Sequence, residues 1–131
     1  NAPTTFTTNQ FLAGVCDGSL NNRLGLERVL STGAAQVLMA AGGSGFSPAS
    51  GGTWNQNSSG KLAGTYEVSD QAAAFNGGAA TTLSSALVPA TPTVIGIGQV
   101  GTGSAFWNGY VGRVSLFMSR LSDSNLVSMT A

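Results

Sequence analysis

The sequence predicts an all-β fold, an antiparallel β-sandwich that ends in a short helix. Three observations predict it. Short apolar or alternating segments recur along the 131 residues, and Gly, Asn, Pro and Asp turn signals separate them. A helical pattern occurs only near the end of the chain, and the length suits one hydrophobic core. We therefore expect one domain over residues 1–131 with roughly seven to nine strands.

The first half of the chain predicts strands and one long loop. Residues 11–16 form an apolar run that ends at an Asp-Gly turn signal, which predicts a strand. Residues 22–30 alternate with a period near two, although Arg28 breaks the alternation, so that a strand and a short helix both remain open. Residues 34–40 read as a buried strand. The Gly-, Ser-, Pro- and Asn-rich run over 42–60 predicts the main loop.

The second half has clearer strand patterns. Residues 61–68 alternate well and predict a strand. The Asn76-Gly77 step predicts a hairpin, because both central turn residues adopt positive φ. Residues 92–98 carry β-branched side chains after two prolines and predict another strand. Residues 110–118 have the cleanest alternation in the chain, which predicts a long central strand.

Two shorter signals surround that last strand. Asn108 and Gly109 predict a turn that leads into it. Ser122 is a suitable N-cap and Asp123 is favourably placed for the helix dipole, so "SDSNLVSM" predicts the helix.

Composition narrows the function classes. Only 8% of the residues are charged, against about 25% in an ordinary soluble domain. The formal net charge is zero and the basic residues are scattered, which removes the electrostatic basis for binding nucleic acid. No uninterrupted apolar segment approaches the ~18 residues of a membrane span, so we expect no membrane insertion. Cys16 is the single cysteine, which excludes an internal disulfide and favours a buried small hydrophobe.

Three stretches of the second half resemble, as a set, the concanavalin A-like, laminin-G-like module of tailed-bacteriophage virion proteins. They are "GKLAGTYEVSDQAAAFNGG", "ALVPATPTVIGIG" and "WNGYVGRVSLFMSRLSDSNLVSMTA". The resemblance covers residues 60–131 well and "DGSLNNRLGL" more weakly. It implies a concanavalin A-like jelly roll with one or more strands before residues 11–16, where only "NAPTTFTTNQ" stands here. Either this segment supplies a short edge strand or a neighbouring chain covers the exposed sheet edge.

The same fold hosts glucanases, so catalysis has to be weighed. Glycoside hydrolysis ordinarily needs two carboxylates that face one cleft. The five acidic residues are not paired at alternate positions on one strand, as they are in the related glucanases; they are Asp17, Glu27, Glu67, Asp70 and Asp123. The chain has no histidine, which excludes Ser-His and Cys-His catalysis. We expect no enzymatic activity.

We expect no cofactor, with calcium as the weaker alternative. Laminin-G-like modules often hold this cation at a sheet rim, and it binds oxygen ligands. Asp17, Asn21 and Asn22 supply such oxygens. The favoured interpretation is a polar hairpin turn whose side chains bond to its own backbone.

The resemblance implies a non-enzymatic structural or adhesion module on a tailed-phage virion surface, made in the host cytoplasm. It would be a capsid decoration protein or a tail-fibre domain. Its expected partners are other virion proteins and further copies of the chain, with a homotrimer as the first expectation.

The alternative function is a lectin that binds host surface glycans. Trp54 and Trp107 would stack under sugar rings while Asn55 and Asn108 bond the hydroxyls. The competing use of both indoles, packing in a core or an interface, is favoured because large aromatic side chains are mostly buried.

Overall fold

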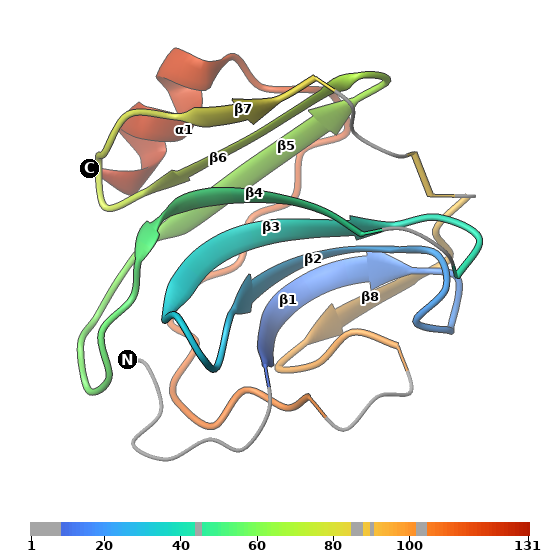
Figure 1. The fold of residues 1–131 in the computed structure, drawn as a ribbon, viewed down its shortest axis with the longest axis horizontal. Helices are drawn as coiled ribbons and strands as arrows, with labels where there is room; N and C mark the ends of the chain where they lie inside the picture. The colour runs from blue at the N-terminus through green and yellow to red at the C-terminus, as the bar shows by residue number, and fades with distance from the viewer. Residues whose placement is uncertain (1–8, 44–45, 85–87, 90, 102–104) are drawn as a thin grey trace.

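The computed structural model describes residues 9–43, 46–84, 88–89, 91–101 and 105–131. Within these ranges the chain forms antiparallel strands and one C-terminal helix (Figure 1). In chain order they are β1 (Gln10–Cys16), β2 (Arg23–Arg28), β3 (Ala34–Ala40), β4 (Phe46–Thr53), β5 (Leu62–Glu67), β6 (Asp70–Phe75), β7 (Thr81–Leu83), β8 (Val94–Ile97) and α1 (Asp123–Thr130). None of the described helices is long and apolar enough to cross a membrane.

The strands form two sheets that face each other as a β-sandwich. The larger sheet has the order β4-β3-β2-β1-β8, and the smaller has the order β5-β6-β7. All pairings between named strands are antiparallel. The predicted all-β class, the sandwich and the C-terminal helix are therefore confirmed.

The core between the sheets lies mainly under β3 and β4. Val37 of β3, Ala49 of β4 and Ala73 of β6 are buried together. A Cβ atom on Gly64 of β5 would lie only 1.9 Å from Cγ2 of Val37, so the two sheets approach most closely where β5 crosses β3. The smaller sheet thus covers only part of the larger one.

A second core lies on the outer face of the larger sheet. Phe11, Cys16, Leu38 and Val100 form this cluster. Cys16 is fully buried, as expected for a small hydrophobic side chain. The loop after β8 therefore covers the outer face with Val100.

The predicted loop over residues 42–60 is wrong in part, because residues 46–53 form strand β4. Its sequence lacks a hydrophobic alternation because small residues are needed where it passes over β6. A Cβ atom on Gly51 would lie 2.8 Å from the carbonyl carbon of Ala74. Pro48 is tolerated because β4 is the edge strand of its sheet.

The hairpin and the helix follow their sequence signals. Asn76 and Gly77 have φ of 49° and 72°, and the amide of Gly78 donates to the carbonyl of Phe75 at 3.0 Å. These are the properties of a type I′ turn, which joins β6 to the loop before β7. The amide of Asn125 donates to Oγ of Ser122 at 3.3 Å, so Ser122 caps α1 as expected.

The predicted central strand over residues 110–118 is wrong. This stretch is irregular, and most of its apolar side chains are exposed, with Met118 at 96%. Figure 1 shows it as an orange-to-red coil that leads to α1. Its alternation is real, but no neighbouring strand in the described part of the chain pairs with it.

The turn predicted at Asn108 and Gly109 is also corrected. The chain bends at Gly109, but within the described residues neither position has positive φ, and no strand follows. The remaining expectation concerns residues 1–10. Gln10 begins β1, while residues 1–8, for which a short edge strand was considered, lie outside the described residues.

Candidate functional site

The candidate site is a groove of about 670 Å³ along the open edge of β5. We call it the β5 groove. Its four walls are β5, the stretch 110–117, the inner face of β1 and β2, and α1. The apolar side chains that line it are Leu12, Ala13, Leu26, Trp54, Leu62, Ala63, Val111, Val114, Phe117, Leu121, Leu126 and Met129.

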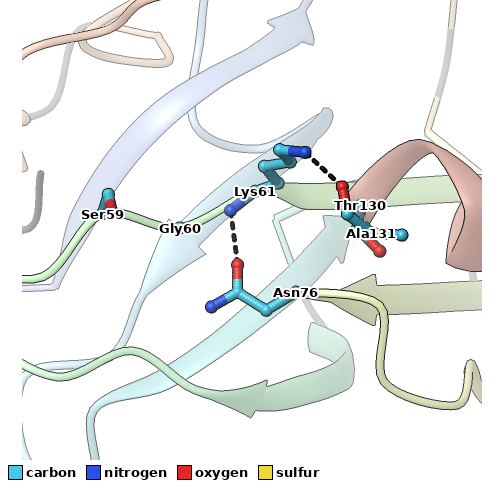
Figure 2. A pocket seen from close by; sticks show the side chains of 6 residues that line it. All are labelled: Ser59, Gly60, Lys61, Asn76, Thr130 and Ala131. Carbon is cyan, nitrogen blue, oxygen red and sulfur yellow. Dashed lines mark hydrogen bonds between the residues drawn. The ribbon is translucent and has the colours of Figure 1, made fainter.

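The main chain of β5 presents polar groups to this groove. The carbonyl of Lys61 accepts from the amide of Asn76 at 3.0 Å. The amide of Lys61 donates to Oδ1 of Asn76 at 2.8 Å (Figure 2). The main-chain groups of Lys61 thus point toward the side of β6. Because these groups alternate in direction along a strand, those of Leu62 and Gly64 point into the groove. The groove therefore contains an edge that can hydrogen-bond to another strand.

The two long walls run in the same direction. Leu62, at the start of β5, and Val111 both pack against one aromatic cluster. At the other end, the amide of Leu121 donates to Oγ1 of Thr65 at 3.2 Å, and Arg120 forms an ion pair with Asp70, which is paired with the last residue of β5. Residues 111–121 thus run alongside β5 from its first residue to its last, but they are not a strand of its sheet.

Apolar side chains near the uncovered part of the larger sheet remain exposed. Ile95 and Ile97 of β8 are 60% and 61% exposed. Their partners in the ladder are Val15 and Ala13, so they lie on the same face of the sheet as the floor of the groove. Leu116 of the facing stretch is 54% exposed. The sheet face beyond the reach of β5 is therefore an apolar surface that the described residues leave in contact with solvent.

Among the residues that the structure describes, the two charged side chains that line the groove are both basic. They are Lys61, at the start of β5, and Arg113 on the opposite wall. Nζ of Lys61 donates to the backbone oxygen of Ala131 in the smaller adjoining pocket (Figure 2). Nε of Arg113 donates to Oγ of Ser115 at 3.2 Å. The groove has a positive end on a chain whose formal net charge is zero.

Trp54 and Trp107 come together, but in a buried cluster. Their ring centroids lie 5.1 Å apart at an interplanar angle of 54°, and Phe75 contacts Trp54 at the same distance. Trp54 is 2% exposed and Trp107 is 8% exposed. Their faces therefore pack against protein, as the favoured core interpretation expected, and offer no open platform for a sugar ring.

The two asparagines predicted beside these indoles are exposed. The carbonyl of Asn55 accepts from Oγ of Ser58 at 2.7 Å, while Nε1 of Trp54 donates to the carbonyl of Ser58 at 3.2 Å. This short loop holds Trp54 in its buried orientation. Asn108 follows Trp107 on the surface of the other segment.

The polar cluster at Asp17 is a hydrogen-bonded turn between β1 and β2. One carboxylate oxygen accepts from the amide and the hydroxyl of Ser19, and the other accepts from Nδ2 of Asn22 at 2.8 Å. These bonds, those from Ser19 first, hold the pKa of Asp17 below its ordinary value. The carbonyl of Asn21 accepts from the amide of Gly43 at 3.0 Å. Each of the three predicted calcium ligands thus has a role in the turn.

The other carboxylates lie apart from the groove lining. Asp70 and Asp123 both bind Arg120 at 2.8 Å, and these side-chain bonds, led by that of Asp70, raise the pKa of Arg120. Glu27 is 2% exposed and accepts from Nε2 of Gln36. Burial raises the pKa of Glu27.

Sequence reasoning missed the groove itself. It identified the apolar alternation of residues 110–118 and the strand at 61–68, but it did not place one beside the other. The available signal was Gly64, because glycine inside a strand marks a close approach of two backbones or sheets.

Comparisons with protein-family models, curated proteins and solved structures find no match. The β5 groove and the sequence resemblance of residues 60–131 are therefore the two features that indicate a function.

Proposed function

We propose that the chain is a non-enzymatic structural or adhesion module of a tailed-phage virion surface, as a capsid decoration protein or a tail-fibre domain. The location comes from the sequence resemblance. The mode of action comes from one observation, the open edge of β5 in a groove with apolar walls. An unpaired sheet edge beside apolar surface is a means of attachment to another polypeptide.

The lining of the groove supports binding rather than hydrolysis. The described residues of its lining include no Asp or Glu, whereas glycoside hydrolysis ordinarily uses two carboxylates at the bond that is cleaved. The apolar side chains of Ile95, Ile97 and Leu116 extend the contact surface beyond the groove. Such surface is typical of a protein interface.

A lectin remains the alternative function, and it requires a different site from the one that the sequence indicated. Trp54 and Trp107 stack on each other and on Phe75 rather than facing solvent. A glycan that used these two indoles would have to separate the aromatic cluster.

The test is to locate the chain on purified particles. Antibodies against the folded domain should label intact virions, either over the capsid shell or at the tail, in immunogold electron microscopy. Mass spectrometry of the same particles should detect the chain in a fixed ratio to a major shell or tail protein. Recovery only from the soluble lysate, with none on particles, would refute the virion assignment. Saturable binding of the folded chain to a host glycan on an array, without recovery of the chain on particles, would favour the lectin.

A further inference from the structure

We propose that the β5 groove binds one extended strand of a partner polypeptide, which pairs with β5 and carries an acidic side chain at the end that approaches Lys61 and Arg113. This inference deepens the proposed attachment function and names the chemistry of the partner.

The first argument is the arrangement of the walls. Leu62 and Gly64 direct main-chain groups into the groove, as the alternation from Lys61 requires. The facing stretch 111–117 runs in the same direction and belongs to no strand. A single strand inserted antiparallel to β5 is therefore antiparallel to both walls. Antiparallel pairing is the more stable and the more frequent arrangement.

The second argument is the apolar surface on both sides of that position. Alternate side chains of a strand point to opposite faces. On one face they would meet Leu12 and Leu26 of the larger sheet, and on the other Leu126 and Met129 of α1. The inserted strand is therefore uncharged along most of its length, with apolar or small side chains on both faces.

The third argument is charge complementarity. Lys61 and Arg113 are the charged side chains of the lining, and both are near the end where Leu62 and Val111 meet the aromatic cluster. A strand antiparallel to β5 reaches this end with its C-terminal half. The acidic side chain of the partner therefore lies near the C-terminus of the bound segment.

The probe is a soluble, fluorescein-labelled peptide of eight residues that alternates valine with threonine and ends in glutamate, with an amidated C-terminus. Fluorescence anisotropy with the whole chain should show saturable binding. A peptide with proline at its fourth position should bind at least about tenfold more weakly, because proline removes a ladder hydrogen bond and its ring is excluded from the strand. Equal binding of these two peptides, or no saturation up to about 1 mM peptide, would overturn the proposal.

Matched variants of the chain locate the contact. Leu62→Pro removes an amide that points into the groove, and Leu62→Ala removes the same side chain but keeps the amide. We expect about tenfold weaker binding for Leu62→Pro than for Leu62→Ala. Melting curves check that both fold; if Leu62→Pro does not fold, the comparison of the two peptides decides. Equal affinities for two folded variants would contradict pairing with β5.

A charge cycle tests the acidic end. Replacement of the peptide glutamate by glutamine should weaken binding to the wild type by roughly two- to fivefold, as for an exposed ion pair. The same replacement should weaken binding to Arg113→Gln by less than it weakens binding to the wild type, because only Lys61 remains at that end. An equal loss with both chains would remove the charge argument, and with it the stated chemistry of the partner.

Two other occupants would give different results, and either result would overturn the proposal. A dimer in light scattering that Leu62→Pro disrupts and Leu62→Ala does not would assign the edge to a second copy. Peptide binding only after deletion of residues 1–8 would assign the groove to that segment of the chain.

The peptide assay and the location on virions are independent of each other. Peptide binding as expected together with absence from virions would refute the proposed location and leave the groove as a strand-binding site.

Discussion

The close contact between Gly64 and Val37 sets the position of β5 over the larger sheet. Enlarging the side chain at position 64 and shortening the one at position 37 tests this contact. In Gly64→Ala the new Cβ atom would lie 1.9 Å from Cγ2 of Val37, far below a normal van der Waals contact. Both residues belong to sheets that other contacts hold in place, so the strands cannot separate freely. Overpacking of this kind costs about 1–3 kcal/mol.

The reciprocal change gives the second side of a double-mutant cycle. Val37→Ala removes two methyl groups from a fully buried side chain. The transfer free energy is about 0.8 kcal/mol per group, and the remaining cavity brings the expected loss to roughly 2–3 kcal/mol. In the double variant the added methyl occupies the space that Val37 leaves. We expect the double variant to lose at least about 1 kcal/mol less than the sum of the two single variants.

Urea denaturation followed by tryptophan fluorescence measures these free energies, because both indoles are buried in the folded chain. Gly112→Ala is the matched control, since a Cβ atom there has no neighbour within 4 Å. It should change the free energy of unfolding by less than about 0.5 kcal/mol. Additive losses in the cycle, to within about 0.3–0.5 kcal/mol, would show that β5 does not cross β3 at these residues.

Three further predictions follow from the turns and the buried acid. Gly77→Val places a β-branched side chain at φ 72° and should lower the free energy of unfolding, measured by urea denaturation, by more than ~1 kcal/mol. Ala79→Val, at an exposed position of the same loop, should not lower it. Equal effects of the two substitutions would contradict the turn. A chelator should leave the melting temperature unchanged, because both carboxylate oxygens of Asp17 already accept hydrogen bonds, and a calcium-dependent rise in melting temperature would disprove this. Because the pKa of Glu27 is raised, the folded chain holds the carboxyl proton more tightly than the unfolded chain does. The stability that this proton contributes is full below the unfolded pKa of about 4.5 and is lost as the pH rises through the folded pKa. Glu27→Gln should therefore gain stability relative to the wild type between pH 4 and pH 8 in urea denaturation, and a constant difference would contradict the shift.

Local sequence signals predicted those elements whose cause is local. The Asn76-Gly77 turn and the Ser122 cap depend on the backbone preferences and side chains of the residues themselves, and both occur where expected. Strands β1, β3 and β5 have apolar or alternating sequences that match their burial against other elements, whereas β8 occurs where predicted but leaves Ile95 and Ile97 exposed. The sequence of β2 left a helix open because Arg28 broke the alternation. In the structure Nε of Arg28 donates to the carbonyl of Trp54 at 2.7 Å, which satisfies a buried guanidinium.

The sequence predictions that were wrong concern segments whose structure depends on a neighbour that is distant in the sequence. Gly51 is small because the backbone of Ala74 approaches it, and no pattern within β4 records that approach. Residues 110–118 have the alternation of a strand, but alternation describes which face a side chain prefers and not whether an edge is within reach. Trp54 and Trp107 follow Gly-, Ser- and Asn-rich stretches, which made them resemble exposed loop residues. They are buried because the two loops meet at the same end of the sandwich.

The edge strands differ in the features that prevent pairing with another chain, and this difference gives an independent reason to expect a partner at β5. Proteins protect edge strands by proline, by bulges or by making the strands short. Among the described edges, β4 contains Pro48 and faces a register shift between Ala35 and Gln36, while β7 and β8 have only three and four residues. Strand β5 has six residues in regular register with β6, and its charged side chain, Glu67, is at the end. A regular edge of six residues without these devices is expected where pairing with another strand is part of the function.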